Sequence, residues 1–407
     1  MNIIFLTLAR IDDIQERGIY QDLMREFAHK GHTLYIMTPC ERRHGLETSL
    51  EEKRGIKVLN VKTLNIQKTN VVEKGIGTLL IEKQYETAIK KFWGDVKFDL
   101  IIYSTPPITL PNVITYLKRK NPQASSYLLL KDIFPQNAVD LGMMSKRGLK
   151  GLLYKFFRNK EKRLYALSDY IGCMSPANVE YVLKHNAELS SERVEVAPNS
   201  IDLRQEFKLP DTERDIIRIR FGLPVDKPVF IYGGNLGKPQ GIPYLIDCLE
   251  AVSYREDCFF LVVGTGTEYD KLDSWLRSKG PGLNVLLMKG LPKTEYDKIV
   301  RACDVGLIFL DHRFTIPNFP SRLLSYLENK MPVICATDSN TDMGRIAEKN
   351  GFGMWCESLL PESFITLIDR MLEMDRKKMG EKGYEYLKRN YTVQNTYMAI
   401  MRHYEDS

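Results

Sequence analysis

The sequence predicts two doubly wound α/β domains in succession, and three observations support this fold class. Its 407 residues are too many for one ordinary domain and suit two of about 200 residues each. Short apolar runs alternate with amphipathic stretches, as expected of parallel strands that helices cover on both faces. A polar stretch at Pro198–Asp215 interrupts this alternation, which then begins again.

The strands are expected at short apolar runs, and helices at stretches with a 3.6-residue apolar period. In the first half, the expected strands are Ile3–Leu8, Thr33–Met37, Val58–Val61, Asp99–Ser104, Ser126–Leu130, Tyr170–Met174 and Val194–Val196, with helices at Ile19–Lys30 and Val113–Arg119 among others. In the second half, the expected strands are Val229–Tyr232, Phe259–Val263, Val285–Met288, Val305–Leu310 and Val333–Ala336. They alternate with helices expected at Tyr244–Val252, Glu268–Ser278 and Leu323–Asn329.

The domain boundaries follow from this pattern and from the polar stretch. We expect one domain at 1–205 and a second at 206–383. Residues 384–407 continue as an apolar-striped helix after the second pattern is complete, and we expect this helix to cross back to the first domain.

Composition bounds the class of protein. Apolar residues make up 43% and charged residues 27%, which is an ordinary globular mixture. The sequence contains no run of 18 apolar residues, so we expect no membrane-spanning helix. The net charge of +6 suits an anionic ligand or membrane surface but is too small to indicate nucleic acid. Seven scattered cysteines without a Cys-x-x-Cys pair indicate a reduced, cytoplasmic chain.

A glycine-rich loop follows the first strand of the second domain. Residues Tyr232–Gly241 contain four glycines, which let backbone N–H groups approach an anion closely, and Lys238 adds charge. The Gly-Lys-Ser/Thr ending of a Walker loop is missing. The alternative is a flexible strand-to-helix turn. The position of the loop and its glycine density favour the anion-binding interpretation.

Two further segments of this domain suit an anion or a nucleotide. Gly264-Thr265-Gly266 follows an expected strand, and a plain tight turn explains it equally well. Ser321 is expected at a helix start, where free N–H groups and the helix dipole favour anions by about 0.3–2 kcal/mol. Arg322 adds a planar fork of donors suited to phosphate. The alternative there is an ordinary capped helix with a solvated arginine.

Four motifs occur in order over nearly the whole chain: Asp132-Ile133-Phe134-Pro135, Pro198-Asn199-Ser200-Ile201-Asp202, Gly234-Asn235-Leu236-Gly237 with Gln240-Gly241, and Pro320-Ser321-Arg322-Leu323 with Tyr326-Leu327. Together they resemble the family 4 glycosyltransferases, which have the GT-B fold of two Rossmann-like domains facing across a cleft. Within that family, the chain resembles the N-acetylfucosaminyltransferase-like branch of bacterial O-antigen and capsule synthesis.

The resemblance implies that the first domain holds the acceptor and the second binds a nucleotide sugar, with UDP as the nucleotide. It implies retaining transfer of a hexosyl or N-acetylhexosaminyl group to a polyprenyl-diphosphate-linked or oligosaccharide acceptor, without a metal or other cofactor. The residues that it assigns to the donor are Gly18, Gly234, Asn235, Lys238, Gln240, Gly264, Gly266, Leu291, Ser321, Arg322, Leu323, Ser325 and Glu328.

The chain departs from the family in its charged residues. Asn235 and Gln240 stand where many members have Arg and Lys, and we expect Lys238 and Arg322 to supply the lost charge. The family's two glutamates, seven residues apart, are also missing. The second of these glutamates binds ribose hydroxyls in the family, and its place is Ser325 here. Glu328 lies one helical turn beyond Ser325 and is expected to reach those hydroxyls.

Asp132 is the candidate catalytic residue, expected to contact the acceptor or the transferred sugar. The alternative is a carboxylate at a helix start, which we weigh equally. The family's first-domain histidine is absent, because no histidine lies between His44 and His185. In a retaining scheme the leaving phosphate takes the acceptor's proton, so the protein supplies positioning and preorganised donors.

A basic segment in the first domain suggests contact with a membrane. Residues 146–163 hold eight basic residues and one acid, and their apolar residues form one helical stripe. Such a helix can lie on an anionic bilayer on the inner face of the cell membrane. The expected contact residues are Lys150, Phe156, Phe157 and Arg158. The alternative is that the stripe packs in the domain core.

Two other functions remain open at this stage. A nucleotide-sugar 2-epimerase has the same fold, but its chemistry needs acid/base carboxylates and histidines, and this chain has few histidines. The second is a catalytically silent GT-B subunit that recruits an active partner, which the missing glutamate pair and histidine keep open.

Overall fold

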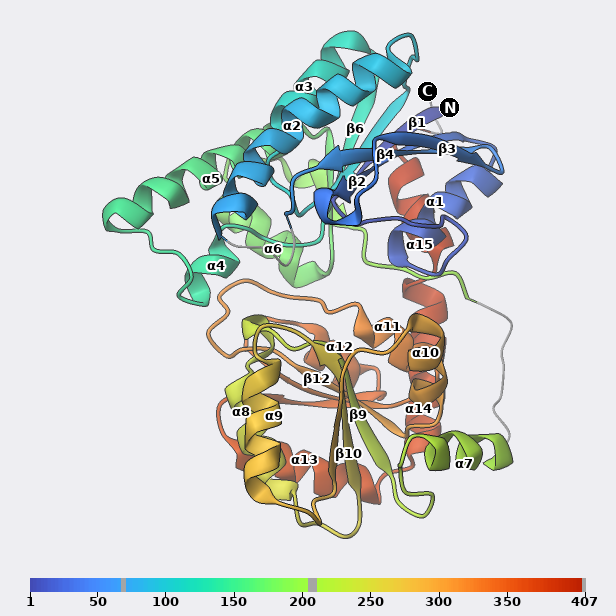
Figure 1. The fold of residues 1–407 in the computed structure, drawn as a ribbon, viewed down its shortest axis with the longest axis vertical. Helices are drawn as coiled ribbons and strands as arrows, with labels where there is room; N and C mark the ends of the chain where they lie inside the picture. Colours follow the sequence, from blue (N-terminus) through green and yellow to red (C-terminus); the bar gives the residue numbers. More distant parts are fainter. Residues whose placement is uncertain (67–70, 204–210, 405–407) are drawn as a thin grey trace. The chain divides into compact units, whose positions relative to one another are not determined.

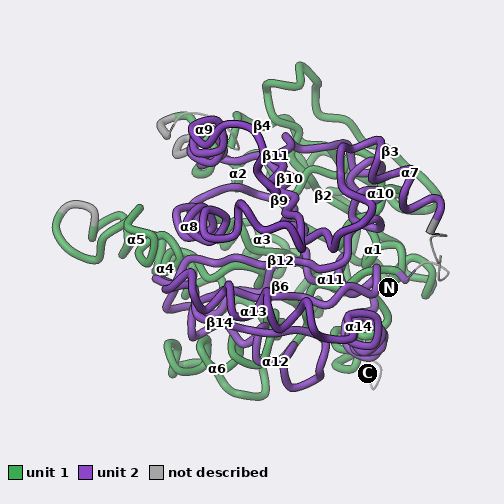
Figure 2. The backbone as a smooth tube through the Cα atoms, turned by 90° about the horizontal axis from the view of Figure 1, so that it is seen from below, with its two compact units in different colours: residues 1–202, 393–407 green, residues 203–392 purple. Residues whose placement is uncertain are grey.

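The computed structural model describes residues 1–66, 71–203 and 211–404 (Figure 1). The chain divides into two compact units, which Figure 2 distinguishes by colour. Unit 1 comprises Met1–Asp202 with Val393–Ser407, and unit 2 comprises Leu203–Thr392. The boundary expected between residues 205 and 206 lies outside the described residues. The helix expected at 384–407 is divided, because α14 (Arg376–Asn390) lies in unit 2 and α15 (Val393–Met401) in unit 1.

Unit 1 contains an eight-stranded sheet in the order β3-β4-β2-β1-β5-β6-β7-β8. Its strands are β1 (Asn2–Leu6), β2 (Thr33–Glu41), β3 (Ser49–Lys53), β4 (Ile56–Thr63), β5 (Leu100–Ser104), β6 (Ser125–Leu130), β7 (Tyr170–Cys173) and β8 (Val194–Val196). All neighbours pair in parallel except β3, which is antiparallel to β4. β3 was not expected, because all five of its residues are exposed and carry no apolar alternation.

Helices cover both faces of this sheet. They are α1 (Ile19–His29), α2 (Val71–Trp93), α3 (Pro111–Lys120), α4 (Gln136–Asp140), α5 (Gly148–Leu167), α6 (Pro176–His185) and the returning α15. The β1→β2 and β4→β5 crossovers run in opposite directions along the sheet, so right-handed connections place α1 and α2 on opposite faces. α15 packs beside α1, and both contribute to one apolar core with β1, β2 and β5.

Unit 2 contains a fully parallel sheet of six strands in the order β11-β10-β9-β12-β13-β14. Its strands are β9 (Val229–Asn235), β10 (Phe259–Thr265), β11 (Val285–Met288), β12 (Val305–Phe309), β13 (Val333–Thr337) and β14 (Gly353–Glu357), of which β14 was not expected. Its helices are α7 (Asp211–Arg220), α8 (Ile242–Val252), α9 (Tyr269–Lys279), α10 (Lys293–Arg301), α11 (Arg322–Glu328), α12 (Met343–Lys349), α13 (Pro361–Glu373) and α14.

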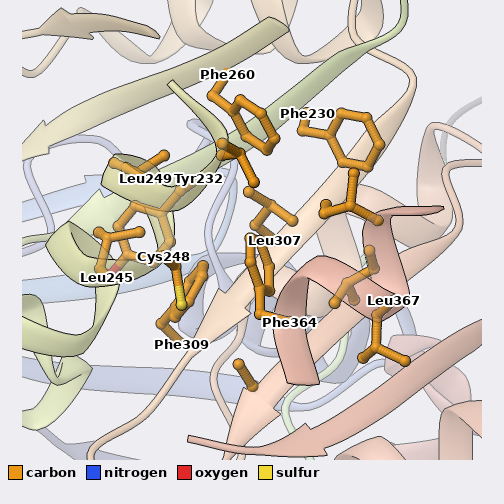
Figure 3. Close-up of a cluster of buried hydrophobic side chains, with 14 of the residues drawn as sticks. Phe230, Tyr232, Leu245, Cys248, Leu249, Phe260, Leu307, Phe309, Phe364 and Leu367 are labelled. Atoms are coloured by element: carbon orange, nitrogen blue, oxygen red, sulfur yellow. The ribbon is translucent and has the colours of Figure 1, made fainter. Parts of the chain in front are cut away.

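The core of unit 2 lies between its sheet and the pair α8 and α13. Figure 3 shows Phe230, Phe260 and Phe309 of the strands meeting side chains of these two helices. All seven cysteines of the chain are buried and unpaired. In the described ranges of both units, no helix combines the length and the apolar character needed to cross a bilayer.

Candidate functional site

The candidate site of unit 2 lies at the carboxyl ends of β9 and β12, where the strand order reverses. β9 has β10 on one side and β12 on the other. The connections β9→β10 and β12→β13 therefore run in opposite directions along the sheet. Its pairing with β12 consists of only two residue pairs and ends at Ile231, although both strands continue. Open parallel sheets bind ligands at such a switch point, because the loops there diverge. The glycine-rich loop follows β9 at this edge.

Tyr326 of α11 fills the opening between the two strands. Its hydroxyl lies 3.2 Å from the carbonyl oxygen of Ile231 and 3.3 Å from that of Leu307, and it accepts the N–H of Gly233 at 3.1 Å. Gly306 makes this approach possible, because a side chain there would collide with the Tyr326 ring. Tyr326 therefore fixes α11 against both strands and satisfies backbone groups that the missing pairing would leave free.

Arg322 lies one turn before Tyr326 on the same helix face, and α11 carries it onto the glycine loop. Its guanidinium carbon is 4.4 Å from the centroid of the Tyr232 ring. A Cβ added at Gly234, where φ is +130°, would lie 3.5 Å from that carbon. The two segments predicted to hold the donor diphosphate are thus brought together in the structure.

The guanidinium of Arg322 has no counter-charge in the described part of the chain. Its Nη1 is buried and lacks any hydrogen-bond partner there. The surrounding groups are aromatic: Tyr232 lies beneath it, and the Tyr296 hydroxyl lies against the neighbouring Gly233. A guanidinium remains protonated at any ordinary pH, so this is an uncompensated and partly desolvated positive charge. Such a charge favours an anionic ligand.

The glycine loop itself is more closed than the sequence predicts. The glycines were expected to let N–H groups approach an anion, but the N–H of Leu236 donates to Thr265 O at 2.9 Å and that of Gly237 to the Gln240 side chain at 3.2 Å. The same Gln240 oxygen accepts the side-chain amide of Asn235 at 2.9 Å. These two N–H groups are therefore occupied, and Gln240 has an internal capping role; its assigned donor contact stays a prediction.

Other backbone amides at this edge stay free. The N–H groups of Lys238, Ser321 and Arg322 have no hydrogen-bond partner within the described ranges. Ser321 is at the N-cap of α11 without a side-chain cap bond, so the hydroxyl cap expected there does not form. The Lys238 side chain is exposed and makes no ion pair with a described residue.

Gly264 and Gly266 follow β10 and allow two loops to approach closely. A side chain at Gly264 would collide with the carbonyl oxygen of Gly234, and one at Gly266 with that of Leu236. Close backbone packing accounts for both glycines. Their assigned contact with the nucleotide stays a prediction.

The remaining donor residues have different surroundings. The Leu323 side chain is fully buried in the unit 2 interior, and its N–H donates to Pro320 O at 3.3 Å, so its assigned donor contact stays a prediction. Leu291, Ser325 and Glu328 are half-buried. Gly18 lies in unit 1 at the start of α1, where its N–H donates to the Asp22 carboxylate at 3.1 Å. That amide is therefore occupied in the structure. That Gly18 contacts the donor diphosphate stays a prediction.

Asp132 and its neighbour Lys131 follow β6 in unit 1. Burial raises the pKa of the Asp132 carboxyl to about 6 and lowers the pKa of the Lys131 ammonium to about 7. Asn137 donates its side-chain amide to both Asp132 oxygens at 2.8 and 2.9 Å, while Lys131 donates to Ala197 O at 2.9 Å. Asp132 does not cap α4, which begins at Gln136 without a side-chain cap.

The pair at the end of β6 suits proton transfer or polar contact near neutral pH. Perturbed pKa values of adjacent acid and base groups are typical of functional sites. Sequence reasoning selected Asp132 but not Lys131, whose shift arises from burial that only the folded chain creates. Tyr296 was missed for the same reason, and Tyr326 was noted only as part of a motif, without a role.

The basic segment of unit 1 forms α5, as the stripe predicts. Leu152, Leu153 and Phe156 have exposed fractions of 63%, 50% and 40%, so this part of the stripe does not pack in the core. Phe157 is half-buried, with its ring 5.1 Å from that of Phe134. Arg158 points inward to a buried ion pair with Glu161 and is therefore not available to a membrane, contrary to expectation. The Lys150 side chain lies outside the described residues.

Comparison with solved structures shows the fold. Sucrose-phosphate synthase from Thermosynechococcus elongatus superposes with a TM-score of 0.76 at 14% identity, over 100% of this chain and 99% of that one. Anabaena Alr3699/HepE in complex with UDP superposes with a TM-score of 0.70 at 14% identity, over 100% of both chains. The protein has the GT-B fold, with two parallel-sheet α/β units.

A family model matches most of unit 2. Residues 213–386 match the family "Glycosyl transferases group 1", so this segment is similar to group 1 glycosyltransferases. It is 23% identical over 265 residues to "Probable glycosyltransferase WbjE" of Pseudomonas aeruginosa, covering 65% of this chain and 64% of the relative. It is 23% identical over 163 residues to "Putative colanic acid biosynthesis glycosyl transferase WcaI" of Escherichia coli K12, covering 39% of each. The matches thus span less than two thirds of these relatives' lengths.

Proposed function

We propose that the protein is a retaining glycosyltransferase that moves a hexosyl or N-acetylhexosaminyl group from a UDP-sugar to a saccharide or lipid-linked acceptor in bacterial surface polysaccharide synthesis. The observation that carries the proposal is the uncompensated guanidinium of Arg322 against the turn at Gly234. The motifs quoted above favour the family 4 branch that resembles N-acetylfucosaminyltransferases.

The geometry at Arg322 suits a diphosphate. A guanidinium offers a planar fork of donors that matches two phosphate oxygens, and its charge is not neutralised by a neighbouring carboxylate. The free N–H groups of Ser321 and Arg322 lie at the start of the same helix. UDP is supported as the nucleotide by the fold neighbour solved with UDP. The polysaccharide role is supported by the relative named for colanic acid biosynthesis.

In this proposal, chemistry rests on positioned charge and requires no metal. Arg322 stabilises the negative charge that develops on the leaving diphosphate, and one such donor contributes about 2.7–4 kcal/mol to the transition state. The glycosyl bond to the phosphate breaks as the acceptor oxygen attacks the same face, and the leaving phosphate oxygen takes the acceptor's proton. Asp132 holds the acceptor hydroxyl or a hydroxyl of the transferred sugar.

The lipid-linked acceptor accounts for the exposed face of α5. Leu152, Leu153 and Phe156 form an apolar patch beside Lys146, Arg147 and Lys155, which are exposed and make no ion pair with a described residue. Cations near an anionic bilayer each contribute about 1 kcal/mol, and the apolar side chains add to this when they enter the headgroup region. We therefore include peripheral contact with an anionic membrane in the proposal.

A vesicle assay tests the membrane contact. Wild-type protein is expected to sediment with phosphatidylglycerol vesicles at low salt and to dissociate at high salt. The double variant Leu152→Glu/Phe156→Glu should lose this binding. Ile216→Glu/Ile219→Glu, on the exposed face of α7, is the matched control and should retain it. Absence of wild-type binding at low salt would remove the membrane from the proposal.

The activity itself is tested with the purified full-length chain. It is incubated with UDP-, GDP- and TDP-sugars in the presence of EDTA, and release of the nucleoside diphosphate is measured. We expect release from a UDP-sugar, and a transferred product with the donor's anomeric configuration by NMR. Binding without turnover would indicate a silent partner subunit, and a change of sugar configuration at C2 would indicate an epimerase.

A further inference from the structure

Unit 1 contains a cavity of about 120 Å³ among α4, α5 and α6. Its lining includes Ile133, the residue after Asp132, and Pro135. Tyr154 and Arg158 contribute from α5, and Tyr181 from α6. A cavity of this volume holds about one six-membered ring, as judged from cavities of similar size that bind benzene. The roles proposed so far for the donor loops and for Asp132 do not involve this cavity.

Several lining residues of the cavity belong to one hydrogen-bonded polar network. Arg158 pairs with Glu161 and also donates to the His185 carbonyl at 2.9 Å and to the Asn186 side chain at 2.7 Å. Tyr165 donates its hydroxyl to the other Glu161 oxygen at 2.8 Å. These groups satisfy one another's hydrogen bonds.

The walls offer hydrogen-bonding groups that no described residue uses. Tyr154 and Tyr181 both line the cavity, and their hydroxyls make no hydrogen bond to a residue of the described ranges. Burial raises the pKa of both phenols, so they remain protonated donors at neutral pH. His185 lies with its Nδ1 2.8 Å from the Tyr181 carbonyl oxygen, so Nδ1 carries a proton and donates to it.

The charges around the cavity balance. Lys146 and Arg158 are positive, Glu161 is negative, and Asp140 lies close enough to Tyr154 and Tyr181 to affect both phenols. An anion site needs surplus positive charge, which this arrangement lacks. Aromatic walls combined with neutralised polar groups instead suit a neutral, hydroxyl-rich ring.

We propose that this cavity binds one pyranose ring of the acceptor, so that a hydroxyl of that ring or its neighbour lies at Asp132. The inference rests on the proposed transferase function and names the acceptor's substrate class in unit 1. α5 then has two roles, because Tyr154 and Arg158 line the cavity while Leu152 and Phe156 are exposed.

Saturation-transfer NMR on the full-length chain tests the proposal. The probes are methyl α-D-glucopyranoside, methyl α-D-galactopyranoside and methyl N-acetyl-β-D-glucosaminide, with inorganic phosphate as the anionic alternative. At least one pyranoside should bind. Tyr154→Phe/Tyr181→Phe, which keeps the rings and removes the hydroxyls, should weaken it about tenfold. His185→Ala, an exposed position, should weaken it independently of any packing change in the double variant.

Tyr254→Phe is the matched control, because it removes a hydroxyl from a tyrosine of unit 2 that is 70% exposed, and it should bind as wild type does. Failure of every pyranoside to bind, binding of phosphate alone, or unchanged binding in both cavity variants would overturn the assignment. UDP titration of the same samples separates the two proposals. Pyranoside binding without UDP binding would support the cavity and refute the transferase.

Discussion

Replacing Arg322 with methionine tests how the candidate donor site works. Methionine keeps a long unbranched side chain over the Tyr232 ring but removes the charge and all five donors. A hydrogen bond to a charged group contributes about 1.5–3 kcal/mol, so the dissociation constant for UDP should rise by about 10- to 150-fold. Turnover should fall further, by about 10²- to 10³-fold, if the charge acts mainly in the transition state.

The stability of the unliganded variant should change little. Loss of the cation–π contact with Tyr232 costs about 0.5–2 kcal/mol, whereas removal of an unpaired, partly desolvated charge relieves a penalty of opposite sign. We therefore expect the free energy of unfolding to stay within about 1 kcal/mol of wild type. This separates a binding defect from a folding defect.

Calorimetric titration with UDP and urea unfolding measure both quantities. Arg345→Met is the matched control, because Arg345 of α12 also lies over an aromatic ring, 5.6 Å from the centroid of Trp355. It should bind UDP as wild type does. Wild-type affinity for UDP in Arg322→Met would refute the assignment of this guanidinium to the diphosphate.

Three further substitutions test the supporting geometry. Tyr326→Phe leaves the Gly233 N–H without its acceptor and should lower the free energy of unfolding by about 1–3 kcal/mol, measured in urea; an unchanged value would contradict the role of the hydroxyl. Gly264→Ala forces a Cβ against the Gly234 carbonyl and should cost about 1–3 kcal/mol, seen as a lower Tm; a wild-type Tm would show that the loops can separate freely. Asp132→Asn should remove the limb of the kcat/KM profile that rises near pH 6, because the wild-type carboxyl has a pKa raised to about 6; persistence of that limb would exclude Asp132 as its source.

Asp132 also affects stability, with a sign opposite to that of a salt-bridged carboxylate. Its pKa is raised from 3.8 to about 6, so the native state holds the proton more tightly than the unfolded chain does. The free energy of unfolding should therefore fall as pH rises from about 4 to about 6. In Asp132→Asn this part of the fall should be absent, which urea unfolding across that pH range would measure.

The fold was predictable because buried parallel strands read as short apolar runs. Twelve such runs were recognised, and all correspond to strands of the structure within a few residues. β3 escaped notice because an exposed edge strand needs no apolar residues. The C-terminal helix was expected to be continuous, but it ends at Asn390 and resumes at Val393, where the chain passes from unit 2 to unit 1.

The candidate site was only partly predictable, because its geometry depends on contacts between distant segments. Glycine density located the loop after β9, and the motif at Ser321 located α11. The stacking of Arg322 on Tyr232 joins residues 90 positions apart, so no local pattern reports it. The capping of Gly237 by Gln240 is local, but the same residues equally suit an open anion loop. Burial at Lys131 likewise requires the folded unit.

A crystal structure of the full-length chain with UDP tests the central claim most directly. The account predicts a diphosphate oxygen within about 3 Å of the Arg322 guanidinium, beside Gly234 and the start of α11. UDP bound elsewhere in unit 2, with Arg322 still unpaired over Tyr232, would contradict it.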